Sequence, residues 1–448
     1  MIIRQLEVNV SHSDLIQLCF NQADAKLLSG WNSTYVTLAV ESVETVSEPQ
    51  SDRNPLIALR RLHEMRKSLY QLEVELPAFT TGIIGHLSYE VAGLIEHSLQ
   101  LPPALETLPP ISFSAYDASV SLHLPSGKTS IYAITEIAAD RLNDWLLSRL
   151  TNQNRSAKIN SVEISGFTKS IAPKAYMEAI ESIQQRILAG DFFQANLTRM
   201  LSVELGQISH SQLAGFAERL LTQSQAPFGA ILNFPCATVI SASPERFFRV
   251  EPTDEGRRIF AEPIKGTRPR GQDPELDEVL KNDLLNSEKD RAENIMIADL
   301  VRNDLSKVCT DESIIADPVC ELRSFRNVHH LVTRVSGILK NEVSNLDALL
   351  AQFPCGSITG APKWAAMEAI ADLEQRGRGI YCGTIGYFDD RGHADFSVAI
   401  RTVVANFEEE GTTLTYGTGG GITILSNPEE EYVETEDKAV GFLRALQS

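Results

Sequence analysis

The sequence of 448 residues contains few cysteines and no apolar run long enough to cross a membrane. Its six cysteines are scattered without a Cys-x-x-Cys pair, which argues against a zinc ribbon and against a disulfide framework. A membrane span requires roughly 18 consecutive apolar residues, and a secretory signal requires a basic segment followed by an apolar one. Because the sequence shows neither pattern, we expect reduced thiols, no membrane partner and a cytoplasmic location.

Basic residues are also scarce, since 40 lysines and arginines stand against 59 aspartates and glutamates. The resulting formal charge of −19 repels the phosphate backbone of nucleic acids, and no local basic patch in the sequence offsets it. We therefore expect no nucleic-acid partner, and an anionic small molecule would require a local cation or a metal ion. The remaining composition, with 43% hydrophobic residues, is typical of a globular protein.

The pattern of the sequence divides the chain into two parts. Residues 1–155 mix short alternating strands with an amphipathic helix expected over 55–69 and a glycine-spaced stretch over 82–90, and none of these indicates a reaction centre. The composition turns polar between 148 and 169, which favours a linker there. We expect an N-terminal α+β region over 1–155 and a second region over 170–448.

The second region mixes helical and strand patterns, with polar side chains on one face of an early strand. Gln194, Asn196 and Thr198 share that face and either line a cavity or face solvent. The expected helices cover 172–189, ending at Gly190, 273–304 and the short segment 347–352, and a last helix is capped by Asn427. Two strands are expected over 228–250, broken at Pro235, and one over 328–338. Hairpin turns are expected at 389–392 and 409–411, with Arg401 on a strand between them.

The segment Pro263-Ile264-Lys265-Gly266-Thr267 is the strongest candidate for chemistry. A proline favours extended backbone before it, and Gly266 removes a side chain that would keep a ligand away from the lysine. A lysine amine is a nucleophile only when unprotonated, so its pKa must fall from about 10.4 for attack at neutral pH. The alternative interpretation is an ordinary solvated turn lysine.

Several acids offer either chemistry or ordinary surface charge. Glu245 follows a proline between strand residues, where an apolar wall would let it keep its proton near neutrality and act as a general acid. Asp290 and Glu293 share a helix face, and Glu431 and Glu434 repeat that spacing on another helix. Two such helices could supply oxygen ligands to one Mg²⁺, although solvated helix faces and the helix dipole explain the same residues.

Two further segments concern anion binding. The stretch 416–425 contains a glycine run, but a dinucleotide fingerprint or a P-loop is followed by a helix, whereas this strand pattern continues. We therefore expect no nucleotide site there. Thr359 and Gly360 precede a helix that runs to about Glu374, whose first N–H groups could hold a carboxylate.

Taken in order, these motifs resemble the chorismate-utilising enzyme family, and within it the aminodeoxychorismate synthases. The resemblance rests on residues 190–194, 243–247, 289–294, 360–363, 400–402 and the glycine run, and more weakly on 27–30 and the stretch ending at Tyr89. It implies an α+β fold of two large antiparallel sheets packed face to face with helices outside. In such a fold the N-terminal half contributes strands to the same sandwich.

The resemblance also implies a reaction. Gln194 stands where isochorismate-forming relatives place a water-activating lysine, and anthranilate synthases carry alanine in place of Lys265. The form with a lysine implies that its amine attacks C2 of chorismate while Glu245 protonates the departing C4 hydroxyl. Ammonia then adds at C4 and expels the lysine, giving a folate precursor. The alternatives are anthranilate formation and a catalytically silent, ligand-sensing chain.

Ligand roles follow from the same resemblance. Glu293 and Glu434 correspond to the family's Mg²⁺ ligands, supported by Asp290 and Glu431. The residues implied for substrate binding are Arg401, Tyr387, Gly419, Gly420, Gly421, His330, Ser357, Thr359, Gln194 and Thr267.

Two partner expectations complete the resemblance. None of the six cysteines lies in a glycine elbow suited to glutamine amidotransfer, so ammonia comes from solution or from a separate glutamine amidotransferase subunit. Some relatives bind tryptophan in the N-terminal sheet region, and Ser29 matches that pattern.

Overall fold

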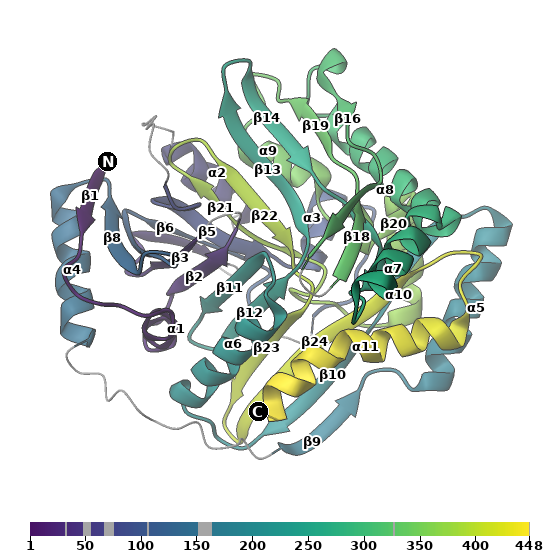
Figure 1. The fold of residues 1–448 in the computed structure, drawn as a ribbon, viewed down its shortest axis with the longest axis horizontal. Helices are drawn as coiled ribbons and strands as arrows, with labels where there is room; N and C mark the ends of the chain where they lie inside the picture. The colour runs from purple at the N-terminus through teal and green to yellow at the C-terminus, as the bar shows by residue number, and fades with distance from the viewer. Residues whose placement is uncertain are drawn as a thin grey trace.

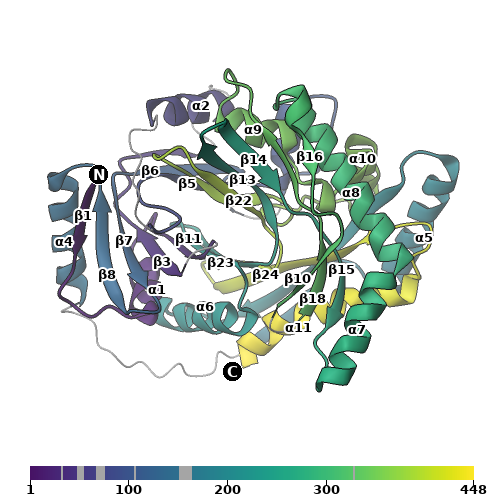
Figure 2. The same ribbon diagram turned by 45° about the horizontal axis from the view of Figure 1, so that its top comes forward.

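The structure, a computed structural model, describes residues 1–31, 34–47, 55–66, 76–104, 107–150, 164–325 and 328–447. These residues form two large antiparallel sheets with helices on their outer sides (Figures 1 and 2), which confirms the predicted α+β fold class. No helix within the described ranges is long and apolar enough to cross a membrane.

The larger sheet mixes strands from the beginning and the end of the chain. Its 12 strands among the described residues run, in spatial order, β1 (Ile2–Gln5), β8 (Lys128–Ala133), β7 (Ala118–His123), β3 (Tyr35–Ala39), β2 (Lys26–Gly30), β11 (Phe228–Asn233), β12 (Ala237–Ser243), β23 (Thr402–Glu408), β24 (Gly411–Ile422), β10 (Gln194–Leu205) and β20 (Gly360–Ala361), with β9 (Ile164–Lys169) also paired to β10. Pairing of β2 with β11 joins the two halves of the chain.

The second sheet is mixed in the same way. Its nine described strands are β16 (Ile315–Ala316), β19 (Val335–Ile338), β14 (Gly256–Ala261), β13 (Arg246–Thr253), β22 (Ala394–Val398), β21 (Thr384–Asp389), β5 (Gly82–Leu87), β6 (Ile111–Tyr116) and β4 (Glu44–Ser47). A small third sheet, which the sequence did not predict, consists of β15 (Ile264–Pro269), β18 (Val328–Val332) and β17 (Glu321–Ser324).

Helices cover the outer faces of both sheets. They are α1 (His12–Phe20), α2 (Pro55–Met65), α3 (Ala92–Ile95), α4 (Glu136–Leu150), α5 (Pro173–Ala189), α6 (His210–Ser224), α7 (Pro274–Asn286), α8 (Glu288–Ser306), α9 (Asn345–Gln352), α10 (Lys363–Glu374) and α11 (Pro428–Gln447). Helices α1, α4, α6 and α11 pack on the larger sheet, whereas α2, α3 and α9 pack on the second. Figure 2 shows α2 and α9 on the opposite side of the molecule from α6 and α11.

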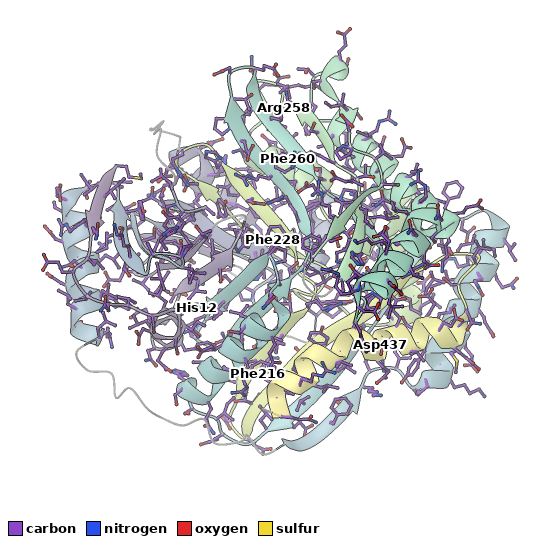
Figure 3. The ribbon with its side chains drawn as sticks, viewed as in Figure 1. His12, Phe216, Phe228, Arg258, Phe260 and Asp437 are labelled. Carbon is purple, nitrogen blue, oxygen red and sulfur yellow. The ribbon has the colours of Figure 1, made fainter. Side chains whose placement is uncertain are left out.

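Apolar side chains from both sheets meet between them. Leu28 and Ala230 of the larger sheet share one buried cluster with Ile84 and Ile385 of the second. Phe228, at the start of β11, belongs to the same cluster and lies near the middle of the molecule in Figure 3. Burial of apolar surface on both faces of each sheet accounts for the cohesion of the two layers.

Two segments pass from one sheet to the other next to each other. Pro244 and Glu245 connect β12 to β13, and Arg401 lies between β22 and β23, so each segment joins a strand of one sheet to a strand of the other. The Ala242 N–H donates to the Arg401 carbonyl at 3.1 Å, and the Val398 N–H donates to the Glu245 carbonyl at 3.0 Å. Glu245 and Arg401 therefore stand together at the seam between the sheets.

The structure contains more breaks than the sequence predicted. The expected helix over 273–304 is two helices, because Ser287 is extended and its side chain accepts a hydrogen bond from the Asp290 N–H to cap α8. The stretch 228–250 holds three strands rather than two, since Pro244 ends β12 as well.

Two other strand predictions were wrong for a similar reason. The stretch 328–338 divides into β18 and β19, which belong to different sheets. Arg401 is not on a strand, because its φ of +52° places it in the left-handed region where the chain turns between sheets.

Several boundaries agree with the sequence. Helix α5 ends at Ala189 with Gly190 at a φ of +87°, and the Asn427 side chain accepts N–H groups of the first turn of α11. The expected helix over 55–69 ends at Met65, and 67–69 lie outside the described residues. Most of the expected linker, 151–163, is also outside them.

Candidate active site

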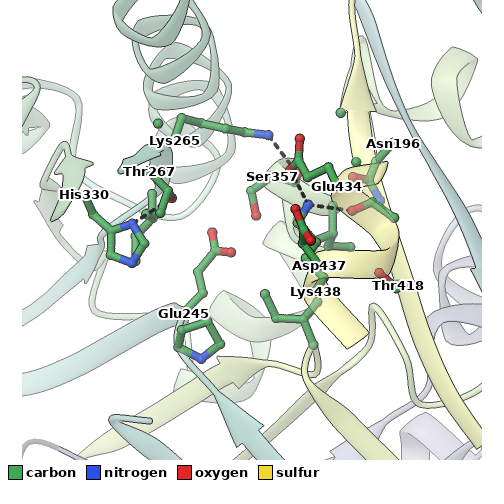
Figure 4. A pocket seen from close by; sticks show the side chains of 18 of the residues that line it. Asn196, Glu245, Lys265, Thr267, His330, Ser357, Thr418, Glu434, Asp437 and Lys438 are labelled. Carbon is green, nitrogen blue, oxygen red and sulfur yellow. Dashed lines mark hydrogen bonds and ion pairs between the residues drawn. The ribbon is translucent and has the colours of Figure 1, made fainter. Parts of the chain in front are cut away.

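A cavity of about 790 Å³ lies where the seam between the large sheets meets the third sheet and helices α8 and α11 (Figure 4). Segments far apart in the sequence line it, including Glu245 from the first crossing and Arg401 from the second. The predicted residues that the structure brings together here are Lys265, Glu245, Arg401, Gly419, Gly420, Gly421, His330, Ser357, Thr267, Glu293, Glu434, Asp290 and Glu431.

Lys265 extends into this cavity from β15. The pairing of β15 with β18 shifts register between Lys265 and Thr267, and the lysine Nζ donates to the Ser357 carbonyl at 3.4 Å. Gly266 has a φ of +77°, and a Cβ there would lie 2.9 Å from the Cβ of Asp290. The glycine thus permits the bulge and its packing against α8. Gly266 also lines the cavity, in agreement with the prediction that it leaves room for a ligand beside the lysine.

Glu245 is buried with an unused oxygen. The residue is 6% exposed, and its Oε1 has no hydrogen-bond partner among the described residues. Burial raises the pKa of this carboxyl group, while the Ser357 hydroxyl and the charge of Lys265 oppose the increase. In Figure 4 the carboxyl group points into the cavity. A group in this state can hold a proton and give it to a bound ligand.

Carboxylates from two helices face one another across the cavity. Burial raises the pKa of Glu293 on α8, and Asp290 and Glu431 add to the increase against the opposing charge of Lys265. Burial and the neighbouring Glu434 likewise raise the pKa of Glu431, whose Oε1 accepts from a serine hydroxyl. These raised values indicate negative charge that the surrounding cations compensate only in part.

Glu434 is half-exposed and has a cationic partner on its own helix. Burial pushes its pKa up, but the Lys438 ammonium 2.7 Å away and the charge of Lys265 outweigh that effect and lower the pKa. Lys438 also donates to the Gly419 carbonyl at 2.7 Å. This pair ties α11 to the glycine run of β24.

Positive charge is available to a ligand in the same cavity. Lys265, Lys289 and Arg401 line it, and none of them has an ion-pair partner within the described part of the chain. His330 accepts or donates one hydrogen bond with the Thr267 hydroxyl at 2.9 Å, and burial lowers its pKa so that it is neutral near pH 7. The three unpaired cations therefore provide binding positions for an anionic group, beside the acids that line the same cavity.

Three residues predicted to bind the substrate do not line the cavity. Tyr387 on β21 is 2% exposed and packs against Trp31 and Phe79 between the sheets, because the pleat turns it to the apolar face. Thr359 is fully buried and donates its hydroxyl to the Cys355 carbonyl, and the Pro362 cap begins α10 further on.

The third of these residues is Gln194. Gln194 is buried behind Gly421, where a Cβ on the glycine would lie 2.2 Å from the Gln194 Nε2 and 3.2 Å from the Lys265 Nζ. Glycine at 421 therefore lets the glutamine amide and the lysine amine approach one another. Ser29, which was predicted to contact tryptophan and not this substrate, lies on β2 opposite Gly229 on β11.

The sequence of residues 18–444 matches the family described as chorismate binding enzyme. This match extends over nearly the whole chain, including every segment that lines the cavity. The chain belongs to this family.

Two relatives of this chorismate binding enzyme are named aminodeoxychorismate synthase. Aminodeoxychorismate synthase from Streptomyces pristinaespiralis is 45% identical over 82% of this chain and 51% of its own length. Aminodeoxychorismate synthase component 1 from Salmonella typhimurium is 34% identical over 88% of this chain and 83% of its own length. This chain thus spans about half the length of the Streptomyces relative.

A solved structure shares the architecture. The crystal structure of anthranilate synthase component I from Streptococcus pneumoniae TIGR4 has a TM-score of 0.78 and 28% sequence identity, covering 91% of this chain and 92% of that one. This structure thus carries a different name from the two relatives above.

The chorismate binding enzyme also presents cavity residues that the sequence did not single out for the site. They include Lys438, Asp437, Tyr381, Tyr416, Thr418, Lys289 and Arg268. The Glu434–Lys438 spacing of four could have predicted an ion pair on α11, but only the packing of that helix on β24 places the pair at the cavity.

The carboxylates of this cavity can form a Mg²⁺ site only if a bound ligand supplies further oxygen atoms to the ion. Within the described ranges no three His, Cys, Asp or Glu side chains gather as a metal cluster. Glu293 and Glu434 nevertheless line one cavity from separate helices. Mg²⁺ is commonly held by one or two carboxylates together with water and a substrate oxyanion, so these residues fit that donor set.

Proposed function

We propose that this chain is an aminodeoxychorismate synthase, which converts chorismate and ammonia to 4-amino-4-deoxychorismate and water. The observation that carries the proposal is the joint presence of Lys265 and the buried acid Glu245 in one cavity. A nucleophile and a proton donor on the same ligand are what a displacement at a ring hydroxyl requires. The relatives named aminodeoxychorismate synthase support the same reaction.

The first half of the proposed reaction forms a covalent bond to the protein. The unprotonated amine of Lys265 attacks C2 of the ring, the ring double bonds shift, and the C4–O bond breaks. Glu245 gives its proton to the departing hydroxyl, which leaves as water. Because Glu245 is buried with a raised pKa, it holds that proton under conditions in which an exposed glutamate has lost it.

The second half releases the protein. Ammonia adds at C4, the double bonds shift back, and the C2–N bond to Lys265 breaks, so the lysine amine is regenerated. Two displacements replace one, and each has a positioned group to assist it. The substrate's carboxylates are oriented by the positive charges of Lys289 and Arg401, since arginine forms paired hydrogen bonds with carboxylates.

Mg²⁺ belongs to the same proposal. Glu293 and Glu434 would hold the ion, with Asp290 and Glu431 as their supports. When bound it supplies positive charge for a ring carboxylate and offsets the acids that face each other across the cavity.

Ammonia has two proposed sources. In solution the chain would use ammonium salts directly. A separate glutamine amidotransferase subunit would supply ammonia from glutamine, since none of the six cysteines has the glycine-elbow setting of an amidotransferase nucleophile. Pull-down of a glutamine-hydrolysing protein, with product formation from glutamine in its presence only, would test the second source.

The experiment that tests the main proposal identifies the product. We expect the purified chain with chorismate, ammonium and Mg²⁺ to yield a compound with the mass of 4-amino-4-deoxychorismate, retaining the enolpyruvyl group. The alternative is anthranilate formation, which the similar Streptococcus structure favours. Appearance of fluorescent anthranilate with loss of pyruvate would decide for that alternative.

The lysine has its own test. We expect Lys265→Ala to lose at least about 100-fold in product formation, because general catalytic groups contribute roughly 10²–10⁴-fold. Lys174→Ala is the matched control, since it removes a lysine on α5 whose side chain is 87% exposed and lies outside the cavity. Covalent labelling should be seen by intact mass in the wild type alone when ammonia is omitted. Unchanged turnover in Lys265→Ala would remove the lysine from the mechanism.

A further inference from the structure

A second cavity, of about 260 Å³, lies further along the same sheet face as the first. Asn196 of the first cavity and Met200 and Ser202 of the second are alternate residues of β10, so their side chains share one face. On β24 the register partner of Ser202 is Thr415, which also lines the second cavity. The two cavities are therefore neighbours along one pair of strands.

Hydroxyl groups form a row across the second cavity. Thr168 on β9, Ser202 on β10 and Thr415 on β24 are partners in register across three adjacent strands, and all three line the cavity. The Oγ1 of Thr415 is buried without a hydrogen-bond partner among the described residues. A buried hydroxyl without a partner costs free energy unless something binds there.

An arginine has an unused donor at the same place. The Arg376 side chain is 9% exposed, its Nη2 donates to the Thr198 hydroxyl at 3.0 Å, and its Nη1 donates to the Gly377 carbonyl at 3.3 Å. Its Nε is buried without any partner in the described part of the chain. Arg376 is thus fixed at two nitrogens and leaves the third for an acceptor that the protein does not provide.

The charge of the cavity wall is positive. Lys169, Arg376 and Arg378 line it, and no acidic side chain does. Lys169 is paired with Glu436 at 2.8 Å, and Arg378 is paired with Glu374 at 2.8 Å. The Glu90 carboxylate accepts from the main-chain N–H groups of Arg378 and Gly379. Arg376 lies 3.7 Å from Glu374, which Arg378 already holds, so Arg376 has no close ion pair of its own among the described residues.

We propose that this second cavity binds a small oxyanion, a phosphate or a carboxylate, through the Nε–H of Arg376 and the hydroxyl of Thr415. Arginine N–H groups and hydroxyls are the donors that such oxygens accept from most favourably. A cavity needs only about 10–15 Å³ to admit one water, so 260 Å³ holds an anion of several heavy atoms.

Arg378, which lines the second cavity, connects the bound anion's site to the first cavity. The Arg378 guanidinium donates to the Asn196 carbonyl at 2.5 Å and to the Ile358 carbonyl at 3.0 Å, and both of these residues line the first cavity. The site does not depend on which reaction occurs in the first cavity, so it can be tested by binding alone.

Calorimetric titration of the full chain tests the proposal. Inorganic phosphate and succinate are titrated separately in a zwitterionic buffer, at an ionic strength kept constant with sodium chloride. We expect saturable binding of at least one of them, a tenfold or greater loss of affinity in Arg376→Gln, and a smaller loss in Thr415→Val. Arg302→Gln removes the same charge from a half-exposed helical position and should bind as the wild type does.

Other outcomes contradict the proposal. Equal affinity in the wild type and Arg376→Gln, or no saturable heat with either anion, would overturn it. Loss of binding in Arg401→Gln alone would place the anion in the first cavity and would also overturn it. Circular dichroism checks folding, and if Arg376→Gln does not fold, Thr415→Val and Arg376→Lys are measured, because lysine keeps the charge without the Nε–H donor.

Discussion

Glu245 shows how burial sets the chemistry of a single residue in this protein. Its carboxyl group is 6% exposed, and one of its oxygens has no partner among the described residues. The folded state therefore binds a proton here more tightly than the unfolded chain does. By linkage, the folded state is favoured below the ordinary pKa of a glutamate, and this stability is lost as pH rises through the raised pKa.

That sign gives a prediction for stability. Glutamine cannot ionise, so we expect Glu245→Gln to unfold at a higher urea concentration than the wild type at pH 8. The difference should shrink as the pH falls toward about 4, near the ordinary pKa of a glutamate. Urea unfolding at several pH values measures it. The prediction fails if the difference in stability does not depend on pH, or if the variant is less stable than the wild type at pH 8. Either result would show that ionising Glu245 in the folded state costs no stability.

Glu434 carries the corresponding prediction for the metal. We expect Glu434→Gln to weaken Mg²⁺ binding about tenfold or more, because loss of a single group at a metal site has effects of roughly 10–100-fold. Glu430→Gln changes the same charge on an exposed position of α11 outside the cavity and serves as the control. Calorimetric Mg²⁺ titration in the presence of chorismate measures both. An unaltered titration in Glu434→Gln would refute the ligand assignment.

At this scale the sequence predicted the type of residue better than its direction. Lys265, Glu245 and the acids of two helices were predicted from motifs, and they do share one cavity. Tyr387 was predicted for the same site but faces the apolar layer, because the direction of a strand side chain depends on which face is buried. A single sequence does not contain that information.

At the scale of elements, the crossings between sheets hold the site together. Arg246 follows Glu245 and lies buried between Asp395 of β22, at 3.0 Å, and Glu262, at 2.6 Å. Glu262 lies three residues before Lys265. The Arg246 side chain therefore connects the segment next to Glu245 with the segment that leads into Lys265. The breaks at Pro244 and Ser287 were missed because each lies inside an otherwise continuous pattern, where a proline or a capping serine decides the boundary.

Removing that arginine should destabilise the protein strongly. We expect Arg246→Gln to lose about 3–5 kcal/mol in the free energy of unfolding, because the fully buried Asp395 loses its ion-pair partner and Glu262 loses one of its three. Arg323→Gln removes another partner of Glu262 from a position about one-third exposed, and should cost no more than about 1 kcal/mol. Urea unfolding at pH 7 compares them, and equal losses would contradict the role given to Arg246.

The whole molecule behaves as one body because both sheets interleave the two halves of the chain. Strands β2 and β11 pair in the larger sheet, and β5 and β21 pair in the second. Division at the predicted linker would therefore cut both sheets. The mixed strand order could not be read from local patterns, since it depends on pairings between segments some 200 to 300 residues apart.

This topology predicts cooperative behaviour. We expect 1–155 and 170–448, each expressed alone, to lack a cooperative thermal transition, because each would expose unpaired strand edges and half of the apolar layer. The intact chain should show one main transition by calorimetry, since its sheets cannot melt separately. Near-ultraviolet circular dichroism of the fragments is the second measurement. A fragment that unfolds cooperatively on its own would show that the halves are independent.

Two main-chain hydrogen bonds join the segments that cross between the sheets, and this clasp affects how the protein can change during evolution. Main-chain hydrogen bonds link Ala242 to Arg401 and Val398 to Glu245, so the main-chain positions of Glu245 and Arg401 are fixed by backbone atoms that every amino acid possesses. Exchanging a side chain at either position leaves the clasp itself intact. New reactivity can therefore arise in this cavity by single replacements, without remodelling a loop.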